Sequence, residues 1–302
     1  MVFLILNVLM SSVMMLVFKL SSKKAWNGDK IILVNYMTAA ACSLVSLLVN
    51  RQGGVSFTLA QAELATLFTR KTLANSAAVG LLFGLAQGFL FVMELMLRSA
   101  STDRNGAGIT IFFSKAAFVG NITLSALIWR ELPTVWQWTA ILMILLALAM
   151  TSSDLKHLRV RSPLLLGLLV LSGTLLETMN KAVTVYVLPE HNALYLTITF
   201  CVALAVCIGR TAWACVREKK RFEMGPAEWA AGGVLGLSNV LATSLSLKAL
   251  ELLPASVVFS TQAAGNLLLV FLMGRFVFKE PASRNLVISI AIAVVSLVLI
   301  HL

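Results

Sequence analysis

Eight ionisable side chains fall within, or at the edge of, stretches that are otherwise almost wholly apolar. An ionised group at membrane depth costs several kcal/mol, so each of these side chains is by default a candidate functional residue. A buried lysine could bind an anionic group, and a buried carboxylate could carry a proton. The eight are Lys19, Glu94, Lys115, Glu177, Lys181, Arg210, Lys248 and Glu251.

Lys115 is the strongest candidate, because it lies about a third of the way into its apolar stretch, within I-F-F-S-K-A-A-F. From that depth its ammonium cannot easily extend to either membrane surface. One interpretation is a fixed positive charge that attracts a carboxylate, phosphate or other electron-rich group. The other is an internal ion pair with Glu94 or Glu177 that only holds helices together.

The other deep charges have local alternatives. Glu177 and Lys181 stand four residues apart, which is the spacing of a favourable helical pair, so either they neutralise each other or Glu177 serves as a proton carrier. Glu94 is the second candidate carboxylate, and Arg98 offers it a pairing partner at the same spacing. Arg210 has no partner nearby in the sequence and is expected to reach the membrane interface.

The composition places these charges in a membrane protein. Of 302 residues, 59% are hydrophobic and 12% charged, whereas roughly a quarter of residues are charged in soluble proteins. The formal charge of +11 fits basic loops on the cytoplasmic side of a many-span protein. No compact basic face with interleaved aromatic residues appears, so we expect no nucleic-acid partner.

Ten stretches have the length and apolarity of a spanning helix, which predicts an all-α membrane protein with ten transmembrane helices. An amphipathic segment within residues 50–73 is expected to lie along the interface. The ten stretches are residues 2–20, 31–49, 74–97, 107–128, 134–151, 163–187, 192–215, 227–250, 254–275 and 284–302.

The second half of the chain repeats features of the first. Gly80 and Gly84 recur as Gly232 and Gly236 at an offset of 152, and Gln87 is matched by Asn239 at the same offset. The turn I-W-R-E-L-P, from residue 128 to 133, recurs as V-F-K-E-P, from residue 277 to 281. Lys19 and Lys181 also occupy matching places. We therefore predict two five-helix repeats, residues 1–151 and 152–302. An odd number of spans per repeat inserts the two copies in opposite directions.

Ten short spans, two five-helix halves and a basic-Glu turn before the last helix of each half resemble the drug/metabolite transporter superfamily, specifically its EamA-type members. The resemblance covers nearly the whole chain. It implies alternating-access transport through a central cavity lined by the first, third, fourth, sixth, eighth and ninth spans. Polar residues on these spans are then candidate substrate ligands, and Tyr36 is a candidate wall residue beside them. The predicted substrate-binding set is Lys115, Gln87, Ser114, Asn180, Asn239, Gln262 and Tyr36, with Glu177 and Glu94 as coupling residues and Lys181 and Lys19 as their charge partners.

The first span carries no acidic residue, whereas small cation exporters of this superfamily hold their substrate with a glutamate there. We therefore expect a secondary transporter for a small anionic, zwitterionic or neutral polar metabolite in the cytoplasmic (inner) membrane. Proton coupling through Glu177 or Glu94 is part of this expectation. A flippase for a lipid-linked headgroup and a multidrug exporter are the alternatives. The expected partners are a small-molecule substrate and the lipid bilayer. The protein is expected to act as a monomer or homodimer.

Neither enzymatic activity nor a cofactor is expected. No nucleophile motif such as G-x-S-x-G is present. The three histidines and four cysteines do not stand at the spacing of metal ligands. The sequence therefore predicts no metal site.

The charge distribution also predicts the orientation in the membrane. The odd-numbered connections hold 15 lysines and arginines and the even-numbered ones hold 4, so the positive-inside rule places both termini outside. The family resemblance implies cytoplasmic termini instead. A reporter that is active only in the cytoplasm, fused after Leu302, is expected to be silent. Activity of that fusion would contradict the charge-based orientation.

Overall fold

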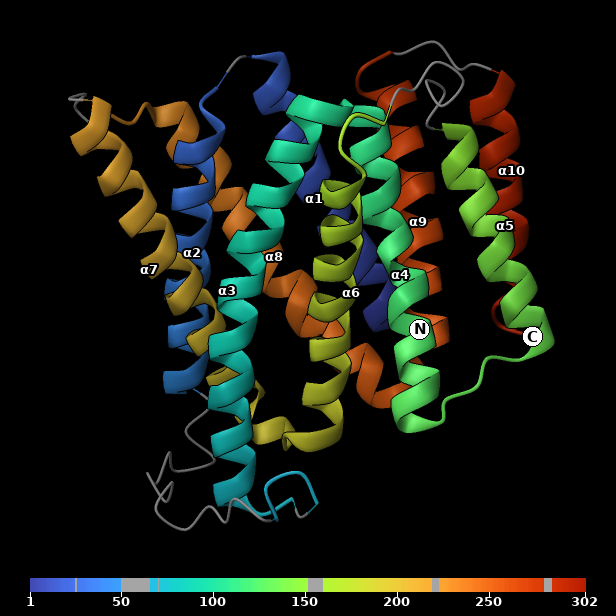
Figure 1. The fold of residues 1–302 in the computed structure, drawn as a ribbon, viewed down its shortest axis with the longest axis horizontal. Helices are drawn as coiled ribbons and strands as arrows, with labels where there is room; N and C mark the ends of the chain where they lie inside the picture. The colour runs from blue at the N-terminus through green and yellow to red at the C-terminus, as the bar shows by residue number, and fades with distance from the viewer. Residues whose placement is uncertain (25, 50–65, 70, 152–159, 219–222, 280–283) are drawn as a thin grey trace. The chain divides into compact units, whose positions relative to one another are not determined.

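The structure is a computed structural model that describes residues 1–24, 26–49, 66–69, 71–151, 160–218, 223–279 and 284–302. The regular elements within these ranges are helices, drawn in chain order in Figure 1. They are α1 (Val2–Lys23), α2 (Gly28–Val49), α3 (Leu73–Asn105), α4 (Ala107–Trp129), α5 (Val135–Thr151), α6 (Pro163–Tyr186), the short 3-10 helix η4 (Pro189–His191), α7 (Asn192–Glu218), α8 (Pro226–Leu252), α9 (Ala255–Phe276) and α10 (Arg284–Leu299).

The α-helices follow the ten predicted stretches closely. The largest difference is at α3, which continues from the predicted end at residue 97 to Asn105. Its last turns are polar rather than apolar, and the helix ends before Gly106, which has a φ of 87° that other residues rarely adopt. Hydropathy marks the apolar part of a helix and not its end. The predicted interfacial segment in residues 50–73 lies largely outside the described residues.

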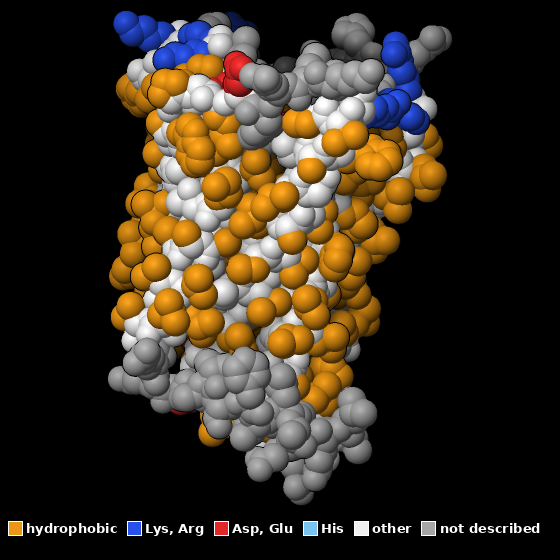
Figure 2. Space-filling model, turned by 90° about the vertical axis from the view of Figure 1, so that its left-hand side faces the viewer, with side chains coloured by type: hydrophobic (Ala, Val, Ile, Leu, Met, Phe, Trp, Pro, Cys, Tyr) orange, Lys and Arg blue, Asp and Glu red, His pale blue; other side chains and the backbone are white. Residues whose placement is uncertain are grey.

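Eight of the described helices are long and apolar enough to cross a membrane. The exceptions are α5 and α10, which are apolar but have 17 and 16 residues. On the face drawn in Figure 2, hydrophobic side chains cover the helices and lysine and arginine side chains gather toward one end. The described chain is all-α and has the features of a multi-pass membrane protein.

The chain forms two compact units, and each takes segments from both predicted halves. Unit 1 comprises residues 1–12, 93–181 and 248–302. In it α4 packs against α9, and α5 packs against both α9 and α10; Figure 1 shows α5 and α10 side by side. Its core includes Phe118, Ile141 and Phe259, all at most 2% exposed.

Unit 2 comprises residues 13–92 and 182–247. Its main helix pair is α2 with α7, which lie side by side in Figure 1. The core of this unit includes Tyr195 and Phe200, both fully buried, and Tyr36 at 5% exposure. At the α2–α7 end of the unit Arg210 forms an ion pair with Asp29 at 2.8 Å. Arg210 has no partner nearby in the sequence, and the residue that pairs with it is 181 residues away.

The repeated glycines bring helices of unit 2 into close contact. A Cβ added at Gly84 of α3 would lie 2.9 Å from Ile198 Cβ and 3.0 Å from the Tyr195 carbonyl oxygen of α7. On α8, a Cβ at Gly236 would lie 2.4 Å from the Asn35 carbonyl oxygen of α2. Small residues allow helix backbones to approach in this way. The third helix of one predicted half thus packs on the second helix of the other half, and this happens twice.

Two adjacent glycines of α8 give a direct test of this packing. A Cβ at Gly232 would lie 2.4 Å from Val34 Cβ and 2.8 Å from the Ile31 carbonyl oxygen, whereas a Cβ at Gly233 meets nothing within 4 Å. Gly232→Ala should cost about 1–3 kcal/mol through overpacking. Gly233→Ala should be neutral or stabilise by up to about 1 kcal/mol, because alanine favours the helix. Denaturation of the two purified variants in detergent measures the difference; equal midpoints would exclude close packing of α8 on α2.

Candidate functional site

Three helices bring the deep charges of unit 1 together. Glu94 lies on α3, Lys115 on α4 and Glu177 on α6. Small residues allow α6 to approach α4: a Cβ at Gly173 would lie 2.9 Å from the Ala117 Cβ. This close approach places Glu177 where its charge acts on Lys115.

A hydrogen bond also links α6 to α4 at this level. The Thr174 hydroxyl donates to the Ala117 carbonyl oxygen at 3.1 Å. A Cβ at Gly120 would lie 2.3 Å from that threonine hydroxyl oxygen, so glycine leaves room for it. The two helices are therefore fixed next to each other within a turn of Glu177.

Glu94 is held by its neighbours. Arg98 Nη2 forms an ion pair with Glu94 Oε1 and donates a hydrogen bond to Ser114 Oγ at 2.8 Å. Ser114 Oγ in turn donates to Glu94 Oε1 at 3.4 Å. The predicted pairing of Glu94 with Arg98 is confirmed, and the hydrogen bond from Arg98 to Ser114 ties α3 to α4 beside Lys115.

Lys115 itself is only partly buried. The positive charge of Arg98 and the negative charges of Glu177 and Glu94 act on it. Within the described part of the chain, however, no carboxylate lies at ion-pair distance from its ammonium. An ammonium has three donors to satisfy. The lysine therefore lies among charges of both signs, with Arg98 acting on it most strongly, and it is not paired with either carboxylate.

Two buried polar atoms of α6 and α4 make no hydrogen bond of normal geometry among the described residues: Glu177 Oε2 and Asn121 Nδ2. The Asn121 amide is nevertheless close enough to the Glu177 carboxylate to act on its charge. Buried polar groups are nearly always hydrogen-bonded, so each exception calls for an explanation. An ammonium, a carboxylate oxygen and an amide nitrogen are together suited to a ligand that carries both donors and acceptors.

Lys181 lies one turn beyond Glu177 on α6 and has a different partner. Its ammonium forms an ion pair with Glu131, in the connection between α4 and α5. Glu131 Oε2 also accepts a hydrogen bond at 3.0 Å from the backbone N–H of Ala255, the first residue of α9. Of the two alternatives for Glu177 and Lys181, mutual neutralisation is not the arrangement observed, because a carboxylate distant in sequence pairs with the lysine instead.

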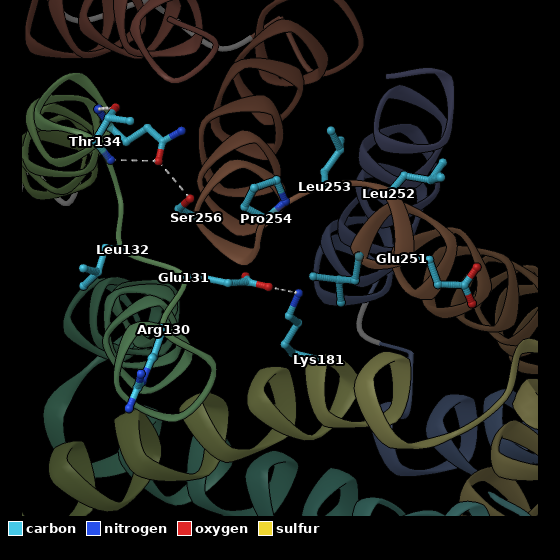
Figure 3. A pocket seen from close by; sticks show the side chains of 12 residues that line it. Arg130, Glu131, Leu132, Thr134, Lys181, Glu251, Leu252, Leu253, Pro254 and Ser256 are labelled. Atoms are coloured by element: carbon cyan, nitrogen blue, oxygen red, sulfur yellow. Dashed lines mark hydrogen bonds and ion pairs between the residues drawn. The ribbon is translucent and has the colours of Figure 1, made fainter. Parts of the chain in front are cut away.

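A pocket of about 490 Å³ surrounds this ion pair. Figure 3 shows Glu131 and Lys181 pointing toward each other, with Ser256 on one side and Glu251 directed away from the pair. The Ser256 hydroxyl donates to Gln137 Oε1 at 3.0 Å. The pocket is lined by Arg130, Glu131, Leu132, Thr134, Gln137, Lys181, Leu250, Glu251, Leu252, Leu253, Pro254 and Ser256.

The remaining predicted residues are divided between the units. Asn180 and Gln262 lie in unit 1 and are partly buried. Unit 2 holds Gln87, which is fully buried, and Asn239, whose amide donates to Asn35 Oδ1 at 3.3 Å. Unit 2 also holds Lys19, which is partly buried, and Tyr36, which packs in the core. The structure therefore brings Glu94, Ser114, Lys115 and Glu177 into one cluster, and the roles of the others stay predictions.

Glu131 and Arg98 are the residues that sequence reasoning missed as parts of a site. Glu131 belongs to the repeated turn, and its local sequence gives no sign of a partner on α6. The signal for its role is the buried position of Lys181, which is 5% exposed and so requires a carboxylate partner.

In the described ranges no three His, Cys, Asp or Glu side chains gather as metal ligands do.

Comparisons with known proteins show the fold alone. No family model and no curated protein matches the sequence. A solved structure described only as "Crystal structure of protein" matches with a TM-score of 0.68 at 15% sequence identity. The match covers 99% of this chain and 98% of that chain. The fold is therefore one that an experimentally determined protein also adopts.

Proposed function

We propose that the protein is a secondary active transporter that moves a small polar metabolite across the cytoplasmic membrane by alternating access. The observation that carries the proposal is the Lys115 ammonium, which lies within an apolar helix without an ion-pair partner among the described residues. A lysine kept in this state costs stability. Binding a passing anionic or electron-rich group would account for that cost.

The proposed binding site has both signs of charge. Lys115 would attract a carboxylate or other electron-rich group of the substrate. Glu177 Oε2 would accept a hydrogen bond from a substrate donor, or carry the coupling proton. Glu94 is less suited to coupling, because Arg98 and Ser114 already engage it. Such a site favours anionic, zwitterionic and neutral polar molecules over simple cations.

The proposal includes ten spans arranged as two inverted five-helix repeats, as in EamA-type members of the drug/metabolite transporter superfamily. Three helix contacts support it, because each joins counterparts of the two halves: α2 with α7, α4 with α9, and α5 with α10. The two short helices, α5 and α10, are both the fifth of their half. At 17 and 16 residues they are about 24–26 Å long, near the lower limit for a span.

The backbone gives independent support for the duplication. Among the described residues, Arg130 and Lys279 are the non-glycine residues with positive φ, at 58° and 53°. Each directly precedes the glutamate of the repeated turn, and the two positions differ by 149 residues, as do the two glutamates, Glu131 and Glu280. A left-handed residue at this place is uncommon for a side chain with a Cβ. Two copies of one turn would explain both.

Replacement of Lys115 tests the transport proposal. A thermal-shift screen of the purified protein against amino acids, small organic acids and polyols first identifies a ligand, because binding to the folded state raises its stability. Lys115→Ala should then reduce uptake of that ligand into proteoliposomes at least tenfold, which is about 1.4 kcal/mol. Its folded fraction should stay unchanged.

Lys248→Ala is the matched control, because Lys248 belongs to the same unit but is exposed, with its ammonium 5.7 Å from the centre of the Phe3 ring. It should transport at the starting rate. Full transport by the folded Lys115 variant would contradict the assignment of this lysine to the binding site.

A further inference from the structure

The Glu131–Lys181 ion pair joins three parts of unit 1 that no regular hydrogen bonding connects. Lys181 belongs to α6, Glu131 follows the end of α4, and Ala255 begins α9. One carboxylate therefore fixes the end of α6 to the start of α9. The left-handed conformation of Arg130 turns the chain immediately before Glu131, so the position of this carboxylate is set by the turn that recurs in the second half.

Lys181 has a second carboxylate within reach. Glu177 precedes it by four residues on the same helix, which places the two side chains on one face about 6 Å apart along the axis. This order, with the acidic residue on the N-terminal side, is the favourable one for a helical pair. Glu177 Oε2 is buried and makes no hydrogen bond of normal geometry among the described residues, although the Asn121 amide acts on this carboxylate. Lys181 therefore has a carboxylate with which it pairs and a second carboxylate one helical turn away.

Loss of the Glu131 partner would leave a buried ammonium uncompensated unless another carboxylate replaced it. Glu177 can do so by a change of side-chain conformation, without movement of α6 itself. The Glu131 carboxylate would then lose its lysine, but it would keep the Ala255 hydrogen bond, and its side chain is 27% exposed, so water could solvate it in part. Lys181 would thus have two alternative partners, as a gate requires.

We infer that Glu131 is a gating residue: its ion pair with Lys181 closes the pocket at this end of unit 1, and the pocket opens when Lys181 changes partner from Glu131 to Glu177. The inference rests on the proposed transport function. It adds a link between the gate and the binding site, because in the open state Lys181 engages the same carboxylate that faces Lys115. Closing the gate releases Glu177 to the substrate or the proton.

Cysteine accessibility at position 256 tests the gate without any substrate. Ser256 lines the pocket and is 3% exposed, so a cysteine there reacts slowly while the pocket is closed. The parent protein carries Ser256→Cys with the four native cysteines, at positions 42, 201, 207 and 215, changed to serine. A membrane-impermeant maleimide is applied to intact cells and to inverted vesicles, and the rate of labelling is measured on each side.

Glu131→Gln should accelerate labelling at least tenfold from one side of the membrane. The amide oxygen can still accept the Ala255 hydrogen bond, so this variant removes the ion pair and keeps the cap of α9. Lys181→Met should accelerate labelling to the same extent, and it replaces Glu131→Gln in the test if that variant folds poorly. Glu251→Gln, an identical chemical change in the same pocket, should label at the parent rate. Parent-like rates in both ion-pair variants, or equal acceleration by Glu251→Gln, would overturn the gate.

Glu177→Gln tests the exchange of partners. Since it removes the partner of the open state, this variant should label at least threefold more slowly than the parent. Combined with Glu131→Gln, it should return the rate to within about threefold of the parent, because both states then lose a partner. A Glu177→Gln variant that labels like the parent would contradict the exchange. Failure of this experiment is distinct from failure of the transport proposal, which is decided by Lys115 and substrate flux.

Discussion

The arrangement of unit 1 depends on how charge is neutralised around α6. An ammonium or a carboxylate on a spanning helix lowers stability unless it is compensated, because the bilayer does not solvate either group. On α6 the two signs stand one turn apart, yet they do not simply cancel. Lys181 is paired with a carboxylate from the α4–α5 connection, and Glu177 faces the lysine of α4. Lys181 therefore fixes the α4–α5 connection, whereas Glu177 acts on Lys115 without forming an ion pair with it.

This arrangement explains why a polar cluster persists among apolar helices. Arg98 and Glu94 satisfy each other and fix Ser114 through hydrogen bonds, which holds α3 and α4 in register. Lys115 and Glu177 are then the charges whose hydrogen-bonding capacity is not filled by the described chain. Full mutual pairing would give a more stable helix bundle, so the cost in stability is consistent with a binding role.

The sequence predicts the helices well and the contacts poorly. Apolar length is a local property, so the ends of most helices are predicted to within a few residues, and only the polar extension of α3 to Asn105 was missed. Pairing is not local. Glu131 lies 50 residues from Lys181, and Asp29 lies 181 residues from Arg210, so neither ion pair follows from helical spacing. The glycine repeat indicated close packing, but only the structure shows that α3 packs on α7 and α8 on α2.

The most direct test of the central claim restores the charge at position 115 chemically. In a protein without its four native cysteines, Lys115→Cys should be inactive in transport of the screened ligand. Treatment with bromoethylamine converts the cysteine to an aminoethyl thioether of nearly lysine length and should recover at least a third of the starting rate, whereas methylation of the same thiol should recover none. If the aminoethylated and methylated proteins transport equally, the ammonium does not act on the substrate and the account is wrong.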